Sequence, residues 1–277
     1  MWKTILSQVC HRDCPLDTVL ESRTVSKGQS LYNCIKCNRT MKKLILDLLF
    51  PVNCLGCGQE GQFICPACFE KMPSNRKRPL KFSSSALTDL IVASDYNYTL
   101  VKQAIHRYKY DFVKDLAESL GQLMVRSLNV ILSDSEESFK NILLIPVPLH
   151  KKRLRWRGFN QAEFLAQKIS QGLKIPLINN ILIRAKYRLP QMAIKSSQER
   201  KENIKQAFQL NPQIKSQGQS FLPSGTVPDP LSLSDIKNKT IILIDDVCTT
   251  RATLEECAKA LKPLQPKQIW GLVVAQG

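Results

Sequence analysis

The sequence lacks a long run of apolar residues. Its longest run, from Leu44 to Val52, is interrupted by Asp47 and falls far short of the ~20 residues that a membrane-spanning helix needs. Residues 1–11 also lack an apolar core followed by a small-residue cleavage site, so they do not resemble a secretory signal. We therefore expect a cytoplasmic protein with no membrane span.

Acidic residues are scarce relative to basic ones. The chain has 23 Asp and Glu residues against 40 Lys and Arg residues, which gives a formal net charge of +17. Such an excess favours polyanionic partners, and nucleic acids and phosphorylated small molecules are the two obvious classes. A generically basic, soluble surface has the same composition, so charge alone does not choose between these interpretations. The 277 residues suffice for one large α/β domain with a small module, or for two modest domains.

The cysteines are clustered rather than spread along the chain. Eight of the ten lie in the first 68 residues as close pairs, and a cytoplasmic protein keeps its thiols reduced, so the pairs indicate a metal site. Two C-x2-C pairs separated by seven residues can place four thiolates tetrahedrally around one Zn²⁺ at ~2.3 Å. We predict a closed, structural zinc site, with an iron–sulfur centre as the alternative, on Cys54, Cys57, Cys65 and Cys68.

A second group of cysteines lies upstream, in Cys10-x3-Cys14 and Cys34-x2-Cys37, with His11 as a spare ligand. Two interpretations stay open, a second metal site and an extension that does not fold. The predicted organisation is an N-terminal extension over 1–40, a zinc-binding module over 41–75 and an α/β domain over 86–277. Within that domain, residues 211–237 are rich in Ser, Pro, Gly and Gln, and we expect them to form a long surface loop.

Strands and helices alternate along the last two thirds of the chain. Helical patterns run from Leu116 to Ile131, from Phe159 to Leu173 and from Leu254 to Leu261. Short apolar runs predict strands at Leu90–Ala93, Asn141–Val147, Ile181–Ile183, Thr240–Ile244 and Ile269–Ala275. This alternation predicts the α/β class, with a mainly parallel sheet and helices on both faces.

One predicted strand is followed by residues that could bind a ligand. Thr240–Ile244 delivers Asp245 and Asp246 at its carboxyl end, where open α/β sheets bind ligands, and a Thr-rich turn then leads into a helix. The free N–H groups and the positive end of that helix attract a phosphate, and the two acids are placed to hold ribose hydroxyls or a hydrated Mg²⁺. The predicted phosphate-binding residues are Cys248, Thr249, Thr250, Arg251, Ala252 and Thr253.

A dense basic segment follows the strand Asn141–Val147. Five of the seven residues Lys151 to Arg157 are cationic. We interpret the segment as a turn that holds pyrophosphate, or that tracks a nucleic-acid backbone while Trp156 stacks on a base. The candidate residues are His150, Lys151, Lys152, Arg153, Arg155 and Arg157.

The acid pair and its loop resemble the 5-phosphoribosyl-1-diphosphate (PRPP) motif of type I phosphoribosyltransferases. The resemblance implies that Asp245 and Asp246 contact the ribose and that the following loop clasps the 5′-phosphate, with Mg²⁺ accompanying PRPP. The loop's usual glycine is Arg251 here. Arginine at this position either strains the backbone and blocks the phosphate, or pairs with the phosphate through its guanidinium.

The strings Pro146–His150 and Arg157–Gln161, with Tyr108–Tyr110 and Leu49-Phe-Pro before the first zinc pair, resemble the ComF family of competence-associated proteins. The resemblance implies a zinc ribbon joined to a PRPP-binding domain of type I phosphoribosyltransferase kind, with a role in DNA uptake. As a binding module without catalysis, the chain would contact single-stranded DNA or a competence helicase through its basic turn and zinc ribbon. Three functions stay open: a phosphoribosyltransferase with an unnamed acceptor, an inactive DNA- or helicase-binding module, and a PRPP-responsive regulator.

Overall fold

The computed structural model describes residues 51–74, 80–81, 86–133, 141–185, 206–212 and 236–277. The upstream cysteine pairs between Cys10 and Cys37, and all but the ends of the predicted loop 211–237, lie outside these residues. Residues Asn53–Gly277 form one compact unit, which contains everything described below. Among the described residues, no helix has the length and apolar character to cross a membrane.

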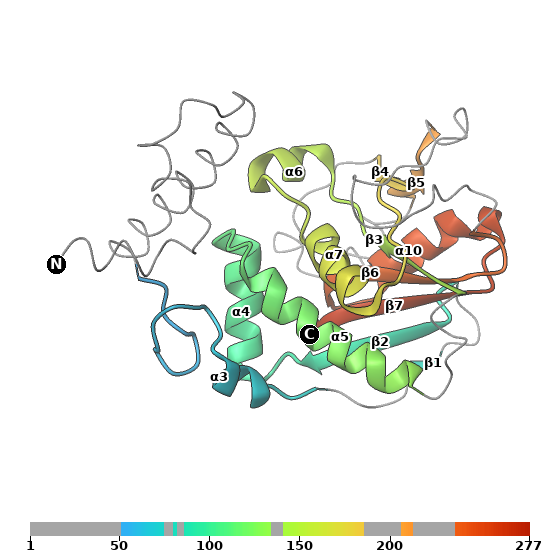
Figure 1. Cartoon of the computed structure of the whole chain (residues 1–277). Coiled ribbons are helices and arrows are strands. Elements are labelled where there is room, and N and C mark those ends of the chain that lie inside the picture. Colours follow the sequence, from blue (N-terminus) through green and yellow to red (C-terminus); the bar gives the residue numbers. More distant parts are fainter. Residues whose placement is uncertain (1–50, 75–79, 82–85, 134–140, 186–205, 213–235) are drawn as a thin grey trace, which may run out of the picture. The chain divides into compact units, whose positions relative to one another are not determined.

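The unit is built on a five-stranded sheet with the order β1-β2-β7-β6-β3. Its four longer strands are parallel, and β1 pairs antiparallel with β2 at one edge. This sheet confirms the predicted α/β class with a mainly parallel sheet (Figure 1). The strands are β1 (Leu80–Lys81), β2 (Asp89–Asp95), β3 (Ile142–Pro146), β6 (Thr240–Cys248) and β7 (Gln268–Gln276).

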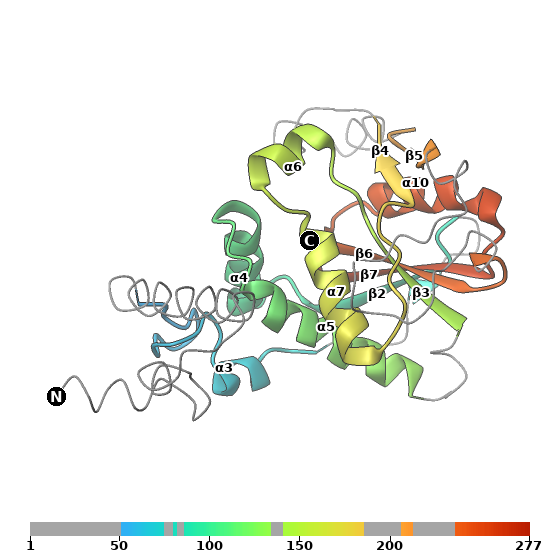
Figure 2. The same cartoon turned by 45° about the horizontal axis from the view of Figure 1, so that its top comes forward.

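Helices cover both faces of this sheet because the central strands are apolar on both sides. In β6, Ile242 and Ile244 belong to one core cluster, while Ile241 and Leu243 belong to a second. The first cluster holds α4 (Thr99–Tyr110), α5 (Leu116–Leu132) and α7 (Gln161–Leu173). The second holds α10 (Ala252–Leu261), which is followed by the 3₁₀ turn η4 (Lys262–Leu264) (Figure 2).

A two-stranded antiparallel sheet packs against α10. It is formed by β4 (Leu182–Arg184) and β5 (Phe208–Leu210). The strand predicted at Ile181–Ile183 therefore exists nearly as expected, but it lies outside the main sheet. Its partner β5 is too short to stand out in the sequence, which is why the pairing was not predicted.

The basic segment is a helix, α6 (Lys151–Arg157), where the sequence analysis expected a turn. Lys, Arg and Leu are good helix formers, and the segment has a capping residue at each end. His150 caps its start by accepting a hydrogen bond from the Lys152 N–H through Nδ1. Gly158 ends it in the left-handed conformation, with φ of 76°.

Helix α4 was not predicted, although its pattern is present in the sequence. Its buried residues follow the 3.6-residue period of one helical face and comprise Leu100, Val101, Ala104, Ile105 and Tyr108. The cysteine segment that precedes it, with the short helix α3 (Pro66–Glu70), buries Cys54, Cys65 and Cys68 in the same core cluster as α4.

Candidate zinc centre and phosphate-binding site

The four predicted zinc ligands converge. The Sγ atoms of Cys54, Cys57, Cys65 and Cys68 all lie within 4.8 Å of one another, and Cys57 Sγ is 3.6 Å from Cys65 Sγ. Tetrahedral zinc with ~2.3 Å bonds spaces its sulfurs about 3.8 Å apart, so the cluster has the right size for one ion. Among the described residues, no other group of three or more His, Cys, Asp or Glu side chains converges in this way.

Backbone N–H groups already orient these sulfurs. The Cys65 N–H donates to Cys54 Sγ at 3.3 Å, and the Cys68 N–H donates to Cys65 Sγ at 3.4 Å. Burial opposes ionisation of Cys54, but the N–H groups around it outweigh burial and lower its pKa to about 6. Hydrogen bonding to Cys65, with burial, raises the pKa of Cys68 to about 12. A metal ion bound between the four sulfurs would stabilise their thiolate forms, and the donor set fits Zn²⁺.

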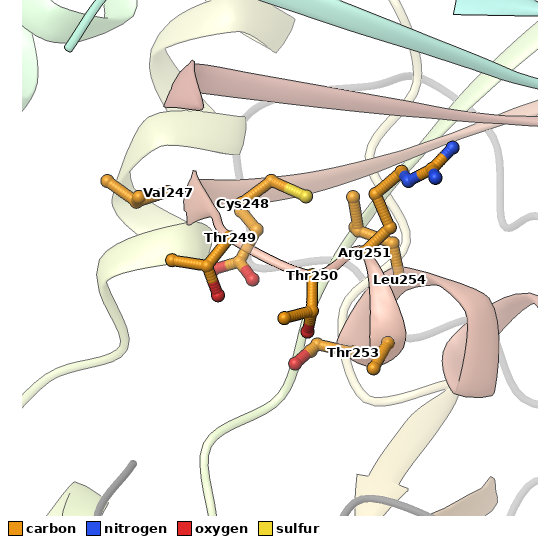
Figure 3. A pocket seen from close by; sticks show the side chains of 9 residues that line it. Val247, Cys248, Thr249, Thr250, Arg251, Thr253 and Leu254 are labelled. Carbon is orange, nitrogen blue, oxygen red and sulfur yellow. The ribbon is translucent and has the colours of Figure 1, made fainter. Parts of the chain in front are cut away.

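A small hollow lies where β6 passes into α10. It is lined by Asp245 and by every residue from Val247 to Leu254, and it holds about 250 Å³ including space open to solvent. The hydroxyls of Thr249, Thr250 and Thr253 gather on one side of the loop (Figure 3). The first turn of α10 adds N–H groups that have no acceptor within the helix, at its positive end. This arrangement has the donors that a phosphate monoester requires.

Arg251 occupies the position at which the resemblance expects glycine, and its backbone has the conformation that glycine favours. Its φ is 60° and its ψ is −6°, in the left-handed region, where a side chain costs energy. The side chain extends away from the three threonine hydroxyls (Figure 3). The Arg251 N–H and charge instead act on the thiol of Cys248, although burial still raises the pKa of that thiol to about 11.

The acid pair lies inside β6, and each carboxylate is oriented by the next residue. Asp245 Oδ1 accepts a hydrogen bond from the Asp246 N–H at 2.9 Å, and Asp246 Oδ1 accepts one from the Val247 N–H at 2.6 Å. Successive residues of a strand point to opposite faces, so the two acids have different neighbours. Burial, and next the charge of Asp246, raise the pKa of Asp245 to about 7 against the opposing charge of Lys109.

Lys109, in the last turn of α4, joins this site from a distant part of the sequence. Its Nζ lies 2.9 Å from Asp246 Oδ1, and the two side chains are 20% and 10% exposed. Burial alone would lower the pKa of Lys109, but Asp246 and Asp245 together raise it above its usual value. In the sequence, Lys109 lies within the string Tyr108–Tyr110, and its place in this site was not predicted.

One side of the basic helix α6 belongs to the same site. The charge of Arg153 acts on Arg184 of β4, whose pKa is lowered first by burial and then by that charge, while Asp245 opposes the shift. Burial and then Arg184 lower the pKa of His150 as well. His150 is therefore neutral near pH 7 and the arginines carry the positive charge.

Arg184 and Gln161 each have a buried N–H donor, Nε and Nε2 respectively, that has no acceptor among the described residues. Gln161 is the first residue of α7. Gln161 is tied to the acid pair through Tyr108, whose hydroxyl donates to the Gln161 carbonyl at 2.8 Å and whose pKa is raised by burial and by Asp246. Buried donors without acceptors are rare in folded proteins, so these N–H groups are available to an acceptor such as a phosphate oxygen or water.

The other side of α6 faces outward and carries aromatic and cationic groups. Trp156 is 65% exposed, and the Phe112 ring meets it edge-on at 5.1 Å. The Arg157 guanidinium lies 5.9 Å from the Trp156 ring and 6.0 Å from that of Tyr110. Lys151, Lys152 and Arg155 are exposed beside them. We call this set, with Tyr110 and His106 of α4, the aromatic–cationic surface.

Two segments of the chain match the models of known families. Residues 45–80 match the model of a double zinc ribbon domain. Residues 159–276, from the start of α7 through β7, match that of a phosphoribosyl transferase domain. The first match contains all four converging cysteines, and the second contains the acid pair and the threonine loop.

Curated relatives span most of the chain. Competence protein F of Haemophilus influenzae is 29% identical over 87% of this chain and 90% of that protein. The DNA utilization protein YhgH of Escherichia coli strain K12 is 25% identical over 82% of each. Competence protein ComFC of Bacillus subtilis is 30% identical over 56% of this chain and 57% of that protein.

Proposed function

We propose that this chain, a member of the ComF family of competence proteins, binds PRPP with Mg²⁺ and serves in DNA uptake. The observation that carries the ligand is a pair of buried donors without acceptors among the described residues, on Arg184, which interacts with the charge of Asp245, and on Gln161, which is linked to Asp246 through Tyr108. PRPP is rich in acceptor oxygens at both ends. The names of the curated relatives, competence and DNA utilization proteins, support the biological role.

Each part of PRPP has a matching group in this site. The 5′-phosphate takes the N–H groups and hydroxyls of the loop from Thr249 to Thr253. The ribose hydroxyls donate to Asp245 and Asp246. The pyrophosphate, with its Mg²⁺, lies toward Arg153 and Arg184, whose guanidinium groups neutralise its charge.

The test is calorimetric titration of the zinc-loaded full chain with PRPP and Mg²⁺. Changing Asp245→Asn together with Asp246→Asn should lower PRPP affinity at least about tenfold, because two carboxylate acceptors are lost. A matched control changes two exposed acids, Asp111→Asn with Asp115→Asn, and should bind like the wild type. Absence of PRPP binding by the wild type at millimolar ligand would refute the assignment.

A second assay, of pyrophosphate release, separates an enzyme from a regulator. In phosphoribosyl transfer the bond from the ribose C1 to the pyrophosphate oxygen breaks while a nucleophile bonds to C1, and cations stabilise the departing pyrophosphate. An enzyme releases pyrophosphate when its acceptor is supplied. A regulator binds PRPP and leaves it intact. Pyrophosphate release measured with nucleobases and nucleic acid as acceptors decides between the two.

A second candidate function, binding of single-stranded DNA, is favoured by the aromatic–cationic surface. An exposed tryptophan flanked by cations is the usual arrangement for stacking a base while neutralising the backbone. Trp156, Lys151, Lys152 and Arg155 provide these groups on the outward side of α6. The basic residues of α6 for which the sequence left two interpretations differ in their neighbours, since the charge of Arg153 acts on Arg184. The helicase partner stays a prediction from the resemblance.

Fluorescence anisotropy with an oligothymidylate tests this second function. Trp156→Ala should weaken binding by about 1–3 kcal/mol, the usual contribution of one stacked base. Arg126→Ala removes a cation stacked on Phe69, which is not part of this surface, and serves as the control. Equal affinity of Trp156→Ala and wild type would exclude the surface as a stacking platform.

A further inference from the structure

The contact between Lys109 and Asp246 is unlike the other ion pairs of the described residues. Those pairs join side chains of which at least one is half exposed or more. Lys109 and Asp246 are 20% and 10% exposed, and their 2.9 Å contact joins α4 to the carboxyl edge of the sheet. A pair that is this well covered is screened little by solvent, so it is strong enough to fix the position of a carboxylate.

Attachment of α4 does not require this pair. The helix is already fixed by a buried apolar face and by the Tyr108 hydroxyl, which donates to the Gln161 carbonyl at 2.8 Å. The Tyr108 ring also packs against Phe159, with 5.7 Å between ring centroids. Covered ion pairs are seldom better for stability than apolar residues of the same size. The pair therefore calls for an explanation beyond packing.

The geometry at Asp246 explains why the ion pair with Lys109 is present. Oδ1 is held from two sides, by the Val247 N–H at 2.6 Å and by Lys109 Nζ at 2.9 Å. With Oδ1 fixed, the carboxylate cannot rotate, and Oδ2 is left as the acceptor for a ligand. Lys109 also cancels one of two adjacent negative charges at a site that has to admit a polyanion.

We propose that Lys109 is a positioning residue of the PRPP site, which holds the Asp246 carboxylate in the orientation that accepts a ribose hydroxyl and cancels its charge. This inference rests on the proposed function. Lys109 acts through Asp246 and does not itself bond to the ligand, so its contribution disappears when Asp246 can no longer act as a charged acceptor. A double-mutant cycle on these two residues measures that dependence directly.

The experiment titrates four forms of the zinc-loaded full chain with PRPP and Mg²⁺: wild type, Lys109→Met, Asp246→Asn, and the two changes combined. Each single change should lower PRPP affinity at least about tenfold. The combined variant, in which the pair is again neutral, should bind no more weakly than Asp246→Asn alone. Lys109→Arg keeps a charged donor and should restore affinity to within about threefold of wild type.

Matched controls remove trivial explanations. Lys259→Met breaks the exposed pair between Lys259 and Glu256, which is 2.7 Å long, and should leave PRPP affinity unchanged. Thermal unfolding and zinc content, measured on every variant, show that the fold is intact.

The outcomes are distinct. Wild type that binds no PRPP refutes the proposed function. Wild type that binds PRPP together with an unchanged Lys109→Met refutes the positioning role alone. Losses that add in the combined variant also refute it, since Lys109 would then act on the ligand independently of Asp246.

Discussion

Arg251→Gly is the change that tests the phosphate loop most directly. Arg251 holds a left-handed backbone, with φ of 60°, at the N-cap of α10. Glycine adopts this conformation without a steric penalty, so the substitution should leave the loop's path unchanged while removing strain. Arg251→Ala is the matched control, because alanine also lacks the guanidinium but keeps the Cβ that causes the strain.

The expected difference in stability between Arg251→Gly and Arg251→Ala follows from two opposing effects. A side chain in the left-handed region costs about 1–2 kcal/mol, which glycine removes. Glycine also has more freedom in the unfolded chain, which costs about 0.5–1 kcal/mol on folding. We therefore expect Arg251→Gly to be more stable than Arg251→Ala by roughly 0.5–1 kcal/mol, or about 1–4 °C in Tm for a domain of this size.

PRPP affinity reports on the side chain separately. Since the Arg251 side chain extends away from the threonine hydroxyls, both variants should bind PRPP within about threefold of wild type (Figure 3). Differential scanning fluorimetry and calorimetric titration measure the two properties. If Arg251→Gly is the less stable variant, the backbone argument is wrong. A loss of tenfold or more in both variants would show that the guanidinium binds phosphate.

Three further predictions concern the zinc centre, the acid pair and α6. Cys57→Ser should lower zinc content by about one equivalent and lower Tm of the whole compact unit, because the other three cysteines lie in the core shared with α4; metal analysis and thermal unfolding measure both. The pKa of Asp245 is raised from 3.8 to about 7 on folding, so the folded state keeps a proton that the unfolded state loses over this range. The contribution of Asp245 to stability therefore falls as pH rises from about 4 to 7. The Tm difference between Asp245→Asn and wild type should accordingly shift in favour of Asp245→Asn between pH 5 and pH 8. A Tm difference that stays constant over this range would contradict the prediction. Lys151→Gln with Lys152→Gln should reduce the salt-dependence slope of oligothymidylate binding by about 1.4, at ~0.7 per lost phosphate contact.

The sequence predicted those features whose evidence is local. The double C-x2-C spacing identified the four cysteines that converge, because two short turns suffice to bring each pair together. Continuous apolar runs located β3, β6 and β7 to within a few residues, since strands buried on both faces have no polar alternation to obscure them. The left-handed position in the phosphate loop was also marked, because the resemblance expects glycine where Arg251 stands.

Contacts that depend on the folded sheet left no comparable local signal. Lys109 meets Asp246 only because α4 packs on the face of β6 toward which Asp246 points, and nothing near Lys109 in the sequence marks that face. The different surroundings of the two sides of α6 could not be predicted either, because its cations are alike in the sequence and differ only in the residues around them. Arg153 acts on the buried Arg184, whereas Lys151 and Lys152 are exposed beside Trp156. The two proposed ligands therefore involve different faces of α6. Simultaneous binding of PRPP and oligothymidylate is the behaviour that distinguishes two sites from one.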